Sequence, residues 1–298
     1  MSSEFRLLLR DLQSDLSSFH LLKYSRRVDG YLFSSKNSGT HWLRAMLSAA
    51  IASHLGMEPP TYSNGPAADA FICHPKKPRQ RPDAPKIGCS HTIPSRLTLI
   101  PLMLGQVFPN LGRLPPTVVL ARHIPEALSS YYVKWSGLMT LGELSDFVRR
   151  PAPGRKRIDD VWWYIRFFNR WGWIARMAPR DVLVVRYEQL MSDPAPLIRR
   201  IWAHWGVALS DADVAAGVEA GRRSRMVERL DPTWDEAVVS TPENRARGRL
   251  SPSDRAFLWR LLAQHLRYSL WATGDRQAVQ GPPVARPAPA GSASGAWS

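Results

Sequence analysis

A turn near the start of the chain carries the residue types that bind phosphate groups. It spans residues 34–40 and reads Ser-Ser-Lys-Asn-Ser-Gly-Thr. The apolar residues 31–33 predict a short buried strand before the turn, and apolar residues at helical spacing over 42–55 predict a helix after it. A strand that turns into a helix in this way places unpaired backbone N–H groups and the positive end of the helix dipole at one point. The sequence therefore predicts an anion-binding turn.

The spacing of this turn differs from that of the common P-loop. That motif consists of a glycine, four further residues and then Gly-Lys-Ser or Gly-Lys-Thr, whereas here Lys36 precedes Gly39. The turn is therefore interpreted as a phosphate site from its residue types and its position between strand and helix, without the usual motif.

Two further polar side chains follow predicted strands. His91 ends the segment Lys-Ile-Gly-Cys-Ser-His, and Arg122 follows the apolar run 117–121. Because the carboxyl ends of parallel strands meet at one edge of a sheet, we expect His91, Arg122 and the turn around Lys36 to lie close together. A neutral histidine beside an anion site is suited to act as a general base.

The order of elements predicts one α/β domain over residues 1–273. Strands near 31–34, 87–89, 117–121 and 182–185 alternate with helices, which is typical of a mostly parallel sheet flanked by helices. The remaining segments are an amphipathic N-terminal helix over 1–22, an aromatic-rich buried helix over 159–177, a proline-rich and basic segment over 59–85, and a Pro/Ala/Gly/Ser-rich tail over 274–298. We expect 59–85 to be a lid or substrate loop, or else a surface insertion, and 274–298 to be disordered.

Composition restricts the function classes. Of 298 residues 44% are hydrophobic, so the chain can bury a real core, but no apolar run is long enough to span a bilayer. Two cysteines are too few for a disulfide framework or a full zinc site, and the residues before 22 do not form a secretory signal, so a cytoplasmic protein is expected. The net charge of +15 favours anionic partners such as nucleic acid, an anionic membrane or a polyanionic cofactor.

Four sequence blocks, in order, resemble those of the cytosolic-type sulfotransferases. These enzymes move a sulfuryl group from 3′-phosphoadenosine 5′-phosphosulfate (PAPS) to an acceptor and release 3′-phosphoadenosine 5′-phosphate (PAP). The block 38–42 resembles the 5′-phosphosulfate loop of the family, and 85–91 is similar to the strand that ends in its catalytic histidine. The block 118–132 resembles the 3′-phosphate element, and 182–190 is similar to the strand that ends in Tyr-Glu-Asp-Met.

This resemblance implies the family fold, which is related to that of the P-loop kinases, and a role for each matched residue. The expected general base is His91, and Lys36 is expected to stabilise charge on the leaving oxygen. The expected PAPS-binding residues are Lys36, Asn37, Ser38, Gly39, Thr40 and His41 in the turn, Trp42 and Tyr187 at the adenine, Arg122 and Ser130 at the 3′-phosphate, and Arg245, Arg247 and Gly248 as a loose match to a late Arg-Lys-Gly element.

The chain departs from the family pattern at three positions. The family lysine stands directly before Ser-Gly-Thr, but here Asn37 holds that position and Lys36 lies one residue earlier. The second threonine of the family loop is His41, and a lysine that the family commonly has two residues before the catalytic histidine is Cys89. Whether Lys36 or Asn37 fills the role of the family lysine therefore stays open, and His41 is either a second acid/base or a polar loop residue.

Sulfuryl transfer requires alignment and neutralisation of charge on the leaving oxygen, and the residue types above provide both. The cofactor expected is PAPS, no metal is expected to be required, and the partner expected is a small molecule with a hydroxyl or amine. Aromatic residues near 159–173 favour an apolar acceptor and the basic loop favours an anionic one, so the acceptor stays open, as does the oligomeric state.

Two other function classes fit the sequence less well. A kinase-like phosphotransferase would need Gly-Lys-Ser/Thr and a Mg²⁺-binding aspartate after a strand, and the sequence has neither. A basic nucleic-acid-binding protein would fit the charge and the 12 tryptophans, but no recognised binding motif is present and many of the aromatic residues follow core periodicity. We therefore expect no specific nucleic-acid partner.

Overall fold

The structure is a computed structural model of the chain, and it describes residues 21, 24–60, 71–79, 81–95, 114–136, 141–149, 160–228, 248–268 and 270. The expected N-terminal helix, apart from Leu21, and the tail 274–298 lie outside the described residues, as do Arg245 and Arg247.

The described residues contain one sheet of five strands, and every pairing in it is parallel. The strands are β1 Gly30–Ser34, β2 Ile72–Cys73, β3 Ile87–Ser90, β4 Thr117–Ala121 and β5 Val182–Arg186, and their order across the sheet is β2-β3-β1-β4-β5. The predicted α/β class with a mostly parallel sheet is therefore confirmed. Strand β2 was not foreseen, because a two-residue strand is too short to show a pattern within the segment 59–85.

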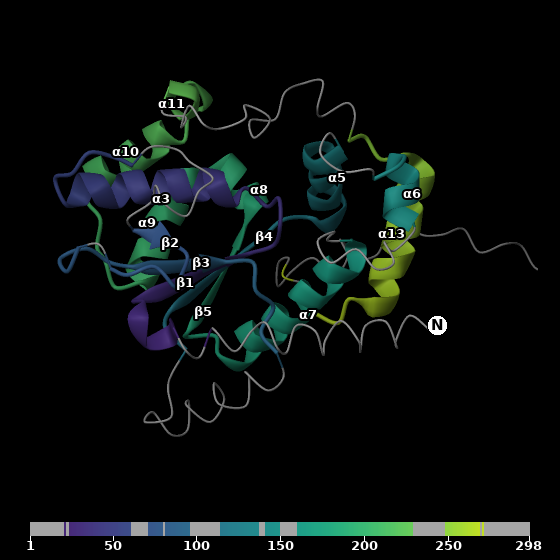
Figure 1. The fold of residues 1–298 in the computed structure, drawn as a ribbon, viewed down its shortest axis with the longest axis horizontal. Helices are drawn as coiled ribbons and strands as arrows, with labels where there is room; N and C mark the ends of the chain where they lie inside the picture. The colour runs from purple at the N-terminus through teal and green to yellow at the C-terminus, as the bar shows by residue number, and fades with distance from the viewer. Residues whose placement is uncertain are drawn as a thin grey trace, which may run out of the picture.

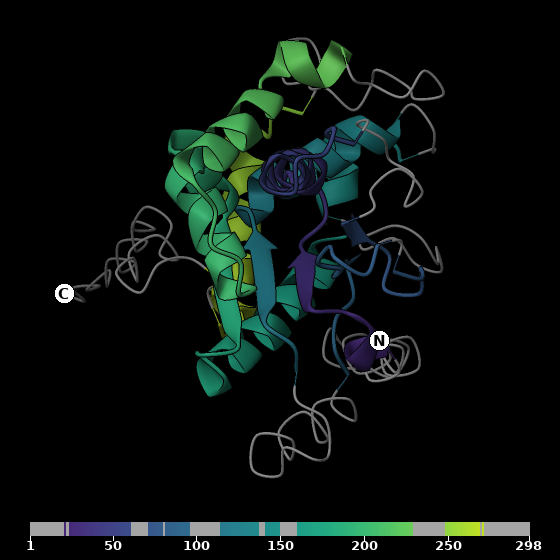
Figure 2. The same ribbon diagram turned by 90° about the vertical axis from the view of Figure 1, so that its left-hand side faces the viewer.

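Helices cover both faces of the sheet (Figures 1 and 2). The described helices are the short 3-10 helix η1 Ser25–Arg27, α3 Thr40–His54, α5 Ile124–Ser136, α6 Leu144–Arg149, α7 Val161–Met177, α8 Tyr187–Ser192, α9 Pro194–His204, α10 Asp211–Ala220, α11 Arg223–Glu228 and α13 Pro252–His265.

Alternate side chains of the central strands enter two separate cores. Leu32 of β1 and Val118 of β4 pack with α3 and α9, whereas Phe33 and Val119 pack with α5 and α7. Because successive residues of a strand point to opposite faces, a strand buried on both faces must be apolar throughout. This requirement explains the continuous apolar runs from which the strands were predicted.

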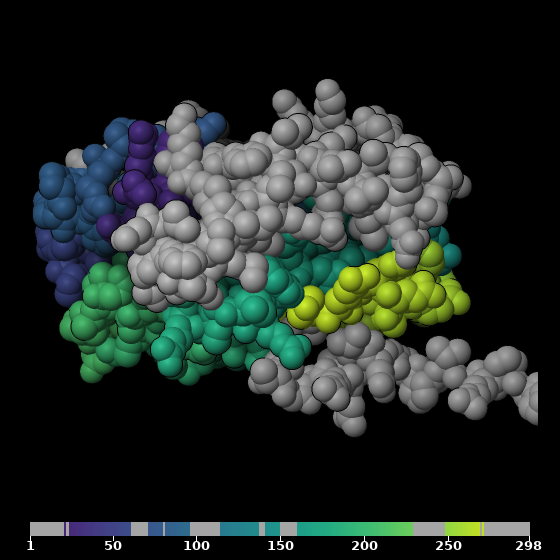
Figure 3. Space-filling view, turned by 90° about the horizontal axis from the view of Figure 1, so that it is seen from below, coloured from purple at the N-terminus to yellow at the C-terminus, as the bar shows by residue number. Residues whose placement is uncertain are grey.

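Helix α13 closes the second core from outside. The amide nitrogen of Asn169 in α7 donates to the carbonyl of His265 at 2.8 Å, and its oxygen accepts from the backbone N–H of Arg267 at 2.6 Å. Arg149 of α6 contacts Asp254 at 2.8 Å. Figure 3 shows α13, in yellow, lying against the teal helices. These contacts join the last described helix to the helices that support the site described below.

The chain leaves the two central strands in opposite directions. From β1 it continues through α3 to β2 and β3 on one side of the sheet, and from β4 it continues through α5–α7 to β5 on the other side. Ligands of open α/β sheets bind outside the carboxyl ends of the strands at such a switch point. The turn after β1 and Arg122 after β4 both lie there.

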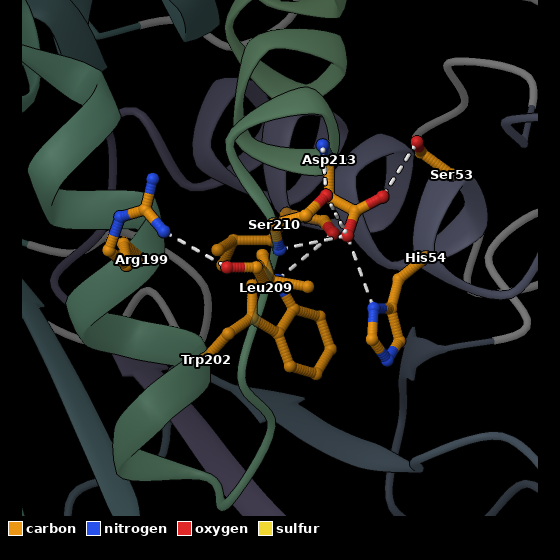
Figure 4. A network of polar contacts seen from close by, with 8 residues as sticks. Ser53, His54, Arg199, Trp202, Leu209, Ser210 and Asp213 are labelled. Carbon is orange, nitrogen blue, oxygen red and sulfur yellow. Dashed lines mark hydrogen bonds and ion pairs between the residues drawn. The ribbon is translucent and has the colours of Figure 1, made fainter.

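A buried carboxylate anchors α10 against the C-terminal end of α3 (Figure 4). Asp213 accepts hydrogen bonds from Ser53 Oγ at 2.9 Å, from Ser210 Oγ at 2.8 Å and from the backbone N–H of Ser210 at 3.0 Å, and it also contacts His54 Nδ1 at 3.1 Å. Burial alone would raise the pKa of Asp213, but the hydrogen bonds from Ser210, Ser53 and His54 outweigh it and lower the pKa to about 2. The carboxylate therefore stabilises the fold that holds α3 in place.

We predict that Asp213→Asn lowers the free energy of unfolding by about 2 kcal/mol at pH 7, because several donors lose their acceptor. The matched control is Asp211→Asn in the same helix turn, since the Asp211 side chain is 97% exposed and that of Asp213 is 9% exposed. Denaturant unfolding at pH 7 measures both. Equal effects of the two substitutions would contradict the assigned role.

The same contact has a defined pH dependence. Because the folded-state pKa of Asp213 is below the usual value of 3.8, its stabilisation is complete above pH 3.8 and is lost as the pH falls toward 2. The difference in stability between the wild type and Asp213→Asn should therefore be smaller at pH 3 than at pH 7.

Candidate active site

The turn after β1 has the backbone geometry of an anion-binding loop. Asn37 has φ 52° and Gly39 has φ 82°, both in the left-handed region. Among the described residues other than glycine, Asn37 alone has a positive φ, and asparagine tolerates that conformation better than most residues. Ser38 Oγ donates to the carbonyl of Ser35 at 2.5 Å and closes the turn. Left-handed residues in such a turn direct successive backbone N–H groups toward one point.

The helix that follows the turn has no side-chain cap at its N-terminus. Gly39 stands at the N-cap of α3, and the first turn of α3 contains no acidic residue. Helices α7, α10 and α13 differ, since Asp160, Ser210 and Ser251 cap them through their side chains. The positive end of the α3 dipole is therefore not neutralised by the helix itself, and an anion there would be stabilised.

Two buried polar atoms of the turn have no hydrogen-bond partner in the structure. These atoms are the amide nitrogen Nδ2 of Asn37 and the hydroxyl of Ser35. Buried donors are nearly always paired in folded proteins, and each unpaired one costs about 1–3 kcal/mol. An oxyanion in the turn would provide acceptors for the Asn37 amide, so the residues present fit a phosphate or sulfate group.

Residues from α7 and from the end of β4 hold the turn from behind. The hydroxyl of Tyr164 donates to the carbonyl of Lys36 at 3.0 Å, and a guanidinium nitrogen of Arg122 donates to the carbonyl of Asn37 at 3.0 Å. The ammonium group of Lys36 lies 5.5 Å from the centre of the Trp163 ring. In Figure 1 the N-terminal end of α3 is turned toward α5, which begins two residues after Arg122. The turn, Arg122 and α7 thus form one site.

His91 is fixed by the residue that ends β1. Its Nδ1 lies 2.8 Å from the carbonyl oxygen of Ser34 and 3.1 Å from the Ser34 hydroxyl. A carbonyl oxygen can only accept, so Nδ1 carries the proton in the neutral ring and the lone pair is on Nε2. Thr40 donates its hydroxyl proton to Ser34 Oγ at 2.8 Å, which connects His91 to the first residue of α3. The arrangement leaves Nε2 as a proton acceptor.

The environment keeps His91 neutral. Burial, together with the positive charges of Lys36, Lys134 and Arg44, lowers the pKa of His91 to about 4, against a raising contribution from the Ser34 carbonyl. Burial likewise lowers the pKa of His41 to about 3, with contributions from Arg44, Lys134 and His91. Both imidazoles are therefore uncharged at neutral pH in a strongly positive site.

Three side chains of the expected nucleotide site lie next to one another. The Arg122 guanidinium stacks on the Tyr187 ring at 4.4 Å, and the Trp42 and Tyr187 rings meet edge to face at 6.0 Å. The Tyr187 ring also lies against Gly39, where an added Cβ would come within 2.7 Å of it. Trp42 is held in turn by a 2.7 Å hydrogen bond from its indole N–H to the carbonyl of Gly221. Trp42, Tyr187 and Arg122 thus form a row beside the turn.

Gly248, the one described residue of the loose match to the Arg-Lys-Gly element, packs against α5. Ser129 Oγ donates to the carbonyl of Gly248, and a Cβ at Gly248 would meet Ser129 Oγ and Val133. Gly248 is therefore packed against the part of α5 that carries Ser130. Arg245 and Arg247, which were expected to act with it, lie outside the described residues.

Sequence reasoning missed three residues of this site, namely Ser34, Tyr164 and Lys134. Ser34 was included in the turn, but no sequence signal shows that its carbonyl orients His91 across two strands. Tyr164 was assigned to a buried aromatic helix, and a hydroxyl on an otherwise apolar helix face would have been the signal for a polar contact. Lys134 lies on the helix predicted after Arg122, twelve residues beyond that arginine, without a motif around it.

Part of the predicted lid is anchored to the sheet. Lys86, which is buried, donates from Nζ to the carbonyls of Pro75 and Lys77, and Arg79 contacts Asp29 at 2.8 Å. Residues 61–70 and 80 of that segment lie outside the described residues, so a lid role for 59–85 stays a prediction.

Within the described ranges, no group of three or more His, Cys, Asp or Glu side chains is arranged to hold a metal ion. No helix among the described residues is long and apolar enough to cross a membrane. Cys73 and Cys89 are not joined in a disulfide, and Cys73 is buried whereas Cys89 is partly exposed.

Comparison with known proteins gives matches at the level of structure. No protein-family model matches the chain, and no curated protein matches it. Among solved structures, it is similar to a mouse sulfotransferase complexed with PAP, with 15% identity and a TM-score of 0.50 over 84% of this chain and 90% of that chain. It is also similar to a retinol dehydratase in complex with androsterone and the inactive cofactor PAP, with 14% identity and a TM-score of 0.51 over 80% of each chain. The chain therefore has the sulfotransferase fold.

Proposed function

We propose that this protein is a sulfotransferase that uses PAPS and a small-molecule acceptor. The observation that carries the proposal is the meeting of an uncapped, left-handed turn, Arg122 and a neutral His91 at the switch point of a sulfotransferase-like sheet. The similar mouse enzyme contains PAP, and the similar retinol dehydratase contains PAP and androsterone, which supports PAPS as the donor and a small hydroxyl compound as the acceptor.

Residues on both sides of the switch point would hold the donor. The backbone amides of Ser38, Gly39 and Thr40 bind the 5′-phosphosulfate, together with the unpaired Asn37 amide. Arg122, which lies two residues before α5, and Ser130, which lies within α5, bind the 3′-phosphate through charge-assisted hydrogen bonds. The aromatic faces of Trp42 and Tyr187 lie beside the adenine, and the sequence resemblance adds Arg245, Arg247 and Gly248 to the donor-binding residues. When bound, PAPS supplies the sulfuryl group that the acceptor receives, and PAP leaves.

His91 takes the proton of the acceptor hydroxyl on Nε2 as that oxygen attacks. The Ser34 carbonyl holds the ring in the required tautomer, and burial keeps Nε2 unprotonated before the acceptor binds. Lys36 places its charge near the leaving oxygen, where negative charge builds up during transfer. Binding of the anionic donor offsets the charges of Lys36, Lys134 and Arg44, so the pKa of His91 rises when the base is needed.

The first prediction concerns nucleotide recognition. PAP should raise the melting temperature of the protein, and AMP, which lacks the 3′-phosphate, should raise it much less. Arg122→Gln should weaken PAP binding by about tenfold or more, because a charge-assisted hydrogen bond contributes roughly 1.5–3 kcal/mol. Thermal shifts and isothermal titration measure both effects.

The matched control for Arg122→Gln is Arg176→Gln, at the exposed end of α7. It removes the same charge without contacting the turn and should leave PAP binding unchanged. Equal thermal shifts from PAP and AMP in the wild type would refute the proposed donor.

The second prediction concerns the base. His91→Ala should reduce turnover by about a hundredfold or more and leave PAP affinity within a few-fold of the wild type, because a general base acts in the transition state. His204→Ala is the control, since His204 contacts the carbonyl of Asp181 at the opposite edge of the sheet. If His91→Ala keeps its turnover and His41→Ala loses it, then His41 is the base.

The pH profile gives an independent readout of the same base. Since the lowered pKa of His91 is about 4, kcat/KM for PAPS, which reports the free enzyme, should fall only as the pH approaches 4 rather than near 6.5. The kcat profile, which reports the donor complex, should fall at a higher pH. An NMR titration of His91 in the free protein with a midpoint near 6.5 would contradict the environment described.

The third prediction concerns the displaced lysine. Lys36→Met should reduce turnover by about a hundredfold and PAP affinity only a few-fold, because its contact strengthens as charge develops. Asn37→Gly is the comparison, because glycine keeps the left-handed φ of 52° while the amide is removed. Asn37→Gly should reduce turnover about tenfold or less. The reverse ranking would show that Asn37 has taken the place of the family lysine.

A further inference from the structure

An aromatic ring that contacts the ammonium group of Lys36 has no assigned role. Lys36 Nζ lies 5.5 Å from the centre of the Trp163 ring, which is within the range of a cation–π contact. The hydroxyl of the next residue, Tyr164, donates to the Lys36 carbonyl at 3.0 Å. Two consecutive residues of α7 therefore contact Lys36, one at its backbone and the other at the charged end of its side chain.

The Trp163 ring is itself held in a fixed orientation. The backbone N–H of Trp163 donates to the side chain of Asp160, the N-cap of α7, at 3.2 Å. The ring stacks on Phe167 with ring centres 5.3 Å apart, and it meets the Tyr164 ring edge to face at 5.2 Å. Tyr164 and Phe167 are fully buried, whereas Trp163 is only half-buried. Trp163 thus provides a fixed aromatic surface at the border between the core and the turn.

An uncharged ring is a suitable partner for a cation that must act on an anion. A lysine side chain is long and flexible, so a contact that restricts it reduces the entropy lost when the ammonium group meets the donor. A carboxylate would restrict Lys36 too, but its negative charge would offset that of the ammonium group and repel the donor. The ring of Trp163 orients the cation and leaves its formal charge available to the leaving oxygen.

The place of Lys36 in the turn differs from that of the family lysine. Lys36 stands one residue earlier, and Asn37, with φ 52°, lies between it and Ser38. Its side chain therefore starts from a different point of the turn and has to be directed to the leaving oxygen from there.

We propose that Trp163 is a positioning residue that holds the ammonium group of Lys36 toward the leaving oxygen through a cation–π contact. This inference rests on the proposed function and adds to it a residue that lies in none of the four matched sequence blocks.

The test is a double-mutant cycle between Trp163 and Lys36. Trp163→Leu keeps an apolar side chain without the ring, and it should reduce kcat about tenfold while PAP affinity stays within about twofold of the wild type. Trp163→Phe keeps a ring and should restore most of the turnover. In the Lys36→Met background, Trp163→Leu should cause no further loss, because the cation that it orients is already absent. Turnover is measured with PAPS and whichever of 4-nitrophenol, 1-butanol and aniline the wild type sulfates fastest.

The matched control is Trp162→Leu, in the same turn of α7. The Trp162 ring meets the His265 ring of α13 at 4.8 Å. Any loss of turnover that Trp162→Leu causes should be the same factor in the wild-type and Lys36→Met backgrounds. If Trp163→Leu also gives equal factors in the two backgrounds, Trp163 supports only the fold and the inference is overturned.

An NMR measurement tests the contact without an acceptor. The indole N–H signal that disappears in Trp163→Phe belongs to Trp163. In the free protein this signal should shift in Lys36→Met and stay in place in Arg176→Gln, which removes a charge from the exposed end of the same helix. A Trp163 signal that does not respond to Lys36→Met overturns the inference.

The two levels of the proposal fail separately. If the wild type binds no PAP and transfers no sulfuryl group, the proposed function is wrong and the inference falls with it. If transfer occurs and Trp163→Leu is as active as the wild type, the sulfotransferase proposal stands and only the role of Trp163 is wrong.

Discussion

The contact between His91 Nδ1 and the carbonyl of Ser34 is the interaction on which the site depends. It joins the ends of β1 and β3, fixes the tautomer of the proposed base, and places that base next to the turn that begins with Ser34. The Ser34 hydroxyl extends the connection to Thr40 and thus to the first turn of α3. Ser34 therefore links the proposed base directly to the anion site.

The second constraint is electrostatic. Lys36, Arg44 and Lys134 all lower the pKa of His91, and the α3 dipole ends in the same place without a side-chain cap. Like charges in a confined site repel one another, which costs stability unless a ligand neutralises them. A donor with several negative charges removes that cost on binding. The positive charges that repel one another in the free protein would then be matched by the negative charges of the donor.

The sequence was sufficient for the parts of the site that follow local rules. The turn after β1, His91 and Arg122 were found because each directly follows an apolar strand, and the parallel arrangement of those strands brought them together in the structure. Strand β2 escaped notice because two residues carry no periodicity. Tyr164 and Lys134 were missed for another reason. Tyr164 contacts the backbone of Lys36, 128 positions away, and Lys134 acts through its charge on His91, which lies in another segment. Their residue types fit an aromatic core helix and a solvated helix face equally well.

The central claim is that this site transfers a sulfuryl group, and the most direct measurement is product analysis in a competition between donors. The protein would be incubated with equal concentrations of PAPS and of ATP with Mg²⁺, together with a panel of phenols, alcohols and amines, and nucleotides and acceptors would be identified by mass spectrometry. The account predicts that PAP and a sulfated acceptor accumulate together in equal amounts, while ATP stays intact. Formation of ADP with a phosphorylated acceptor, and no PAP, would contradict it.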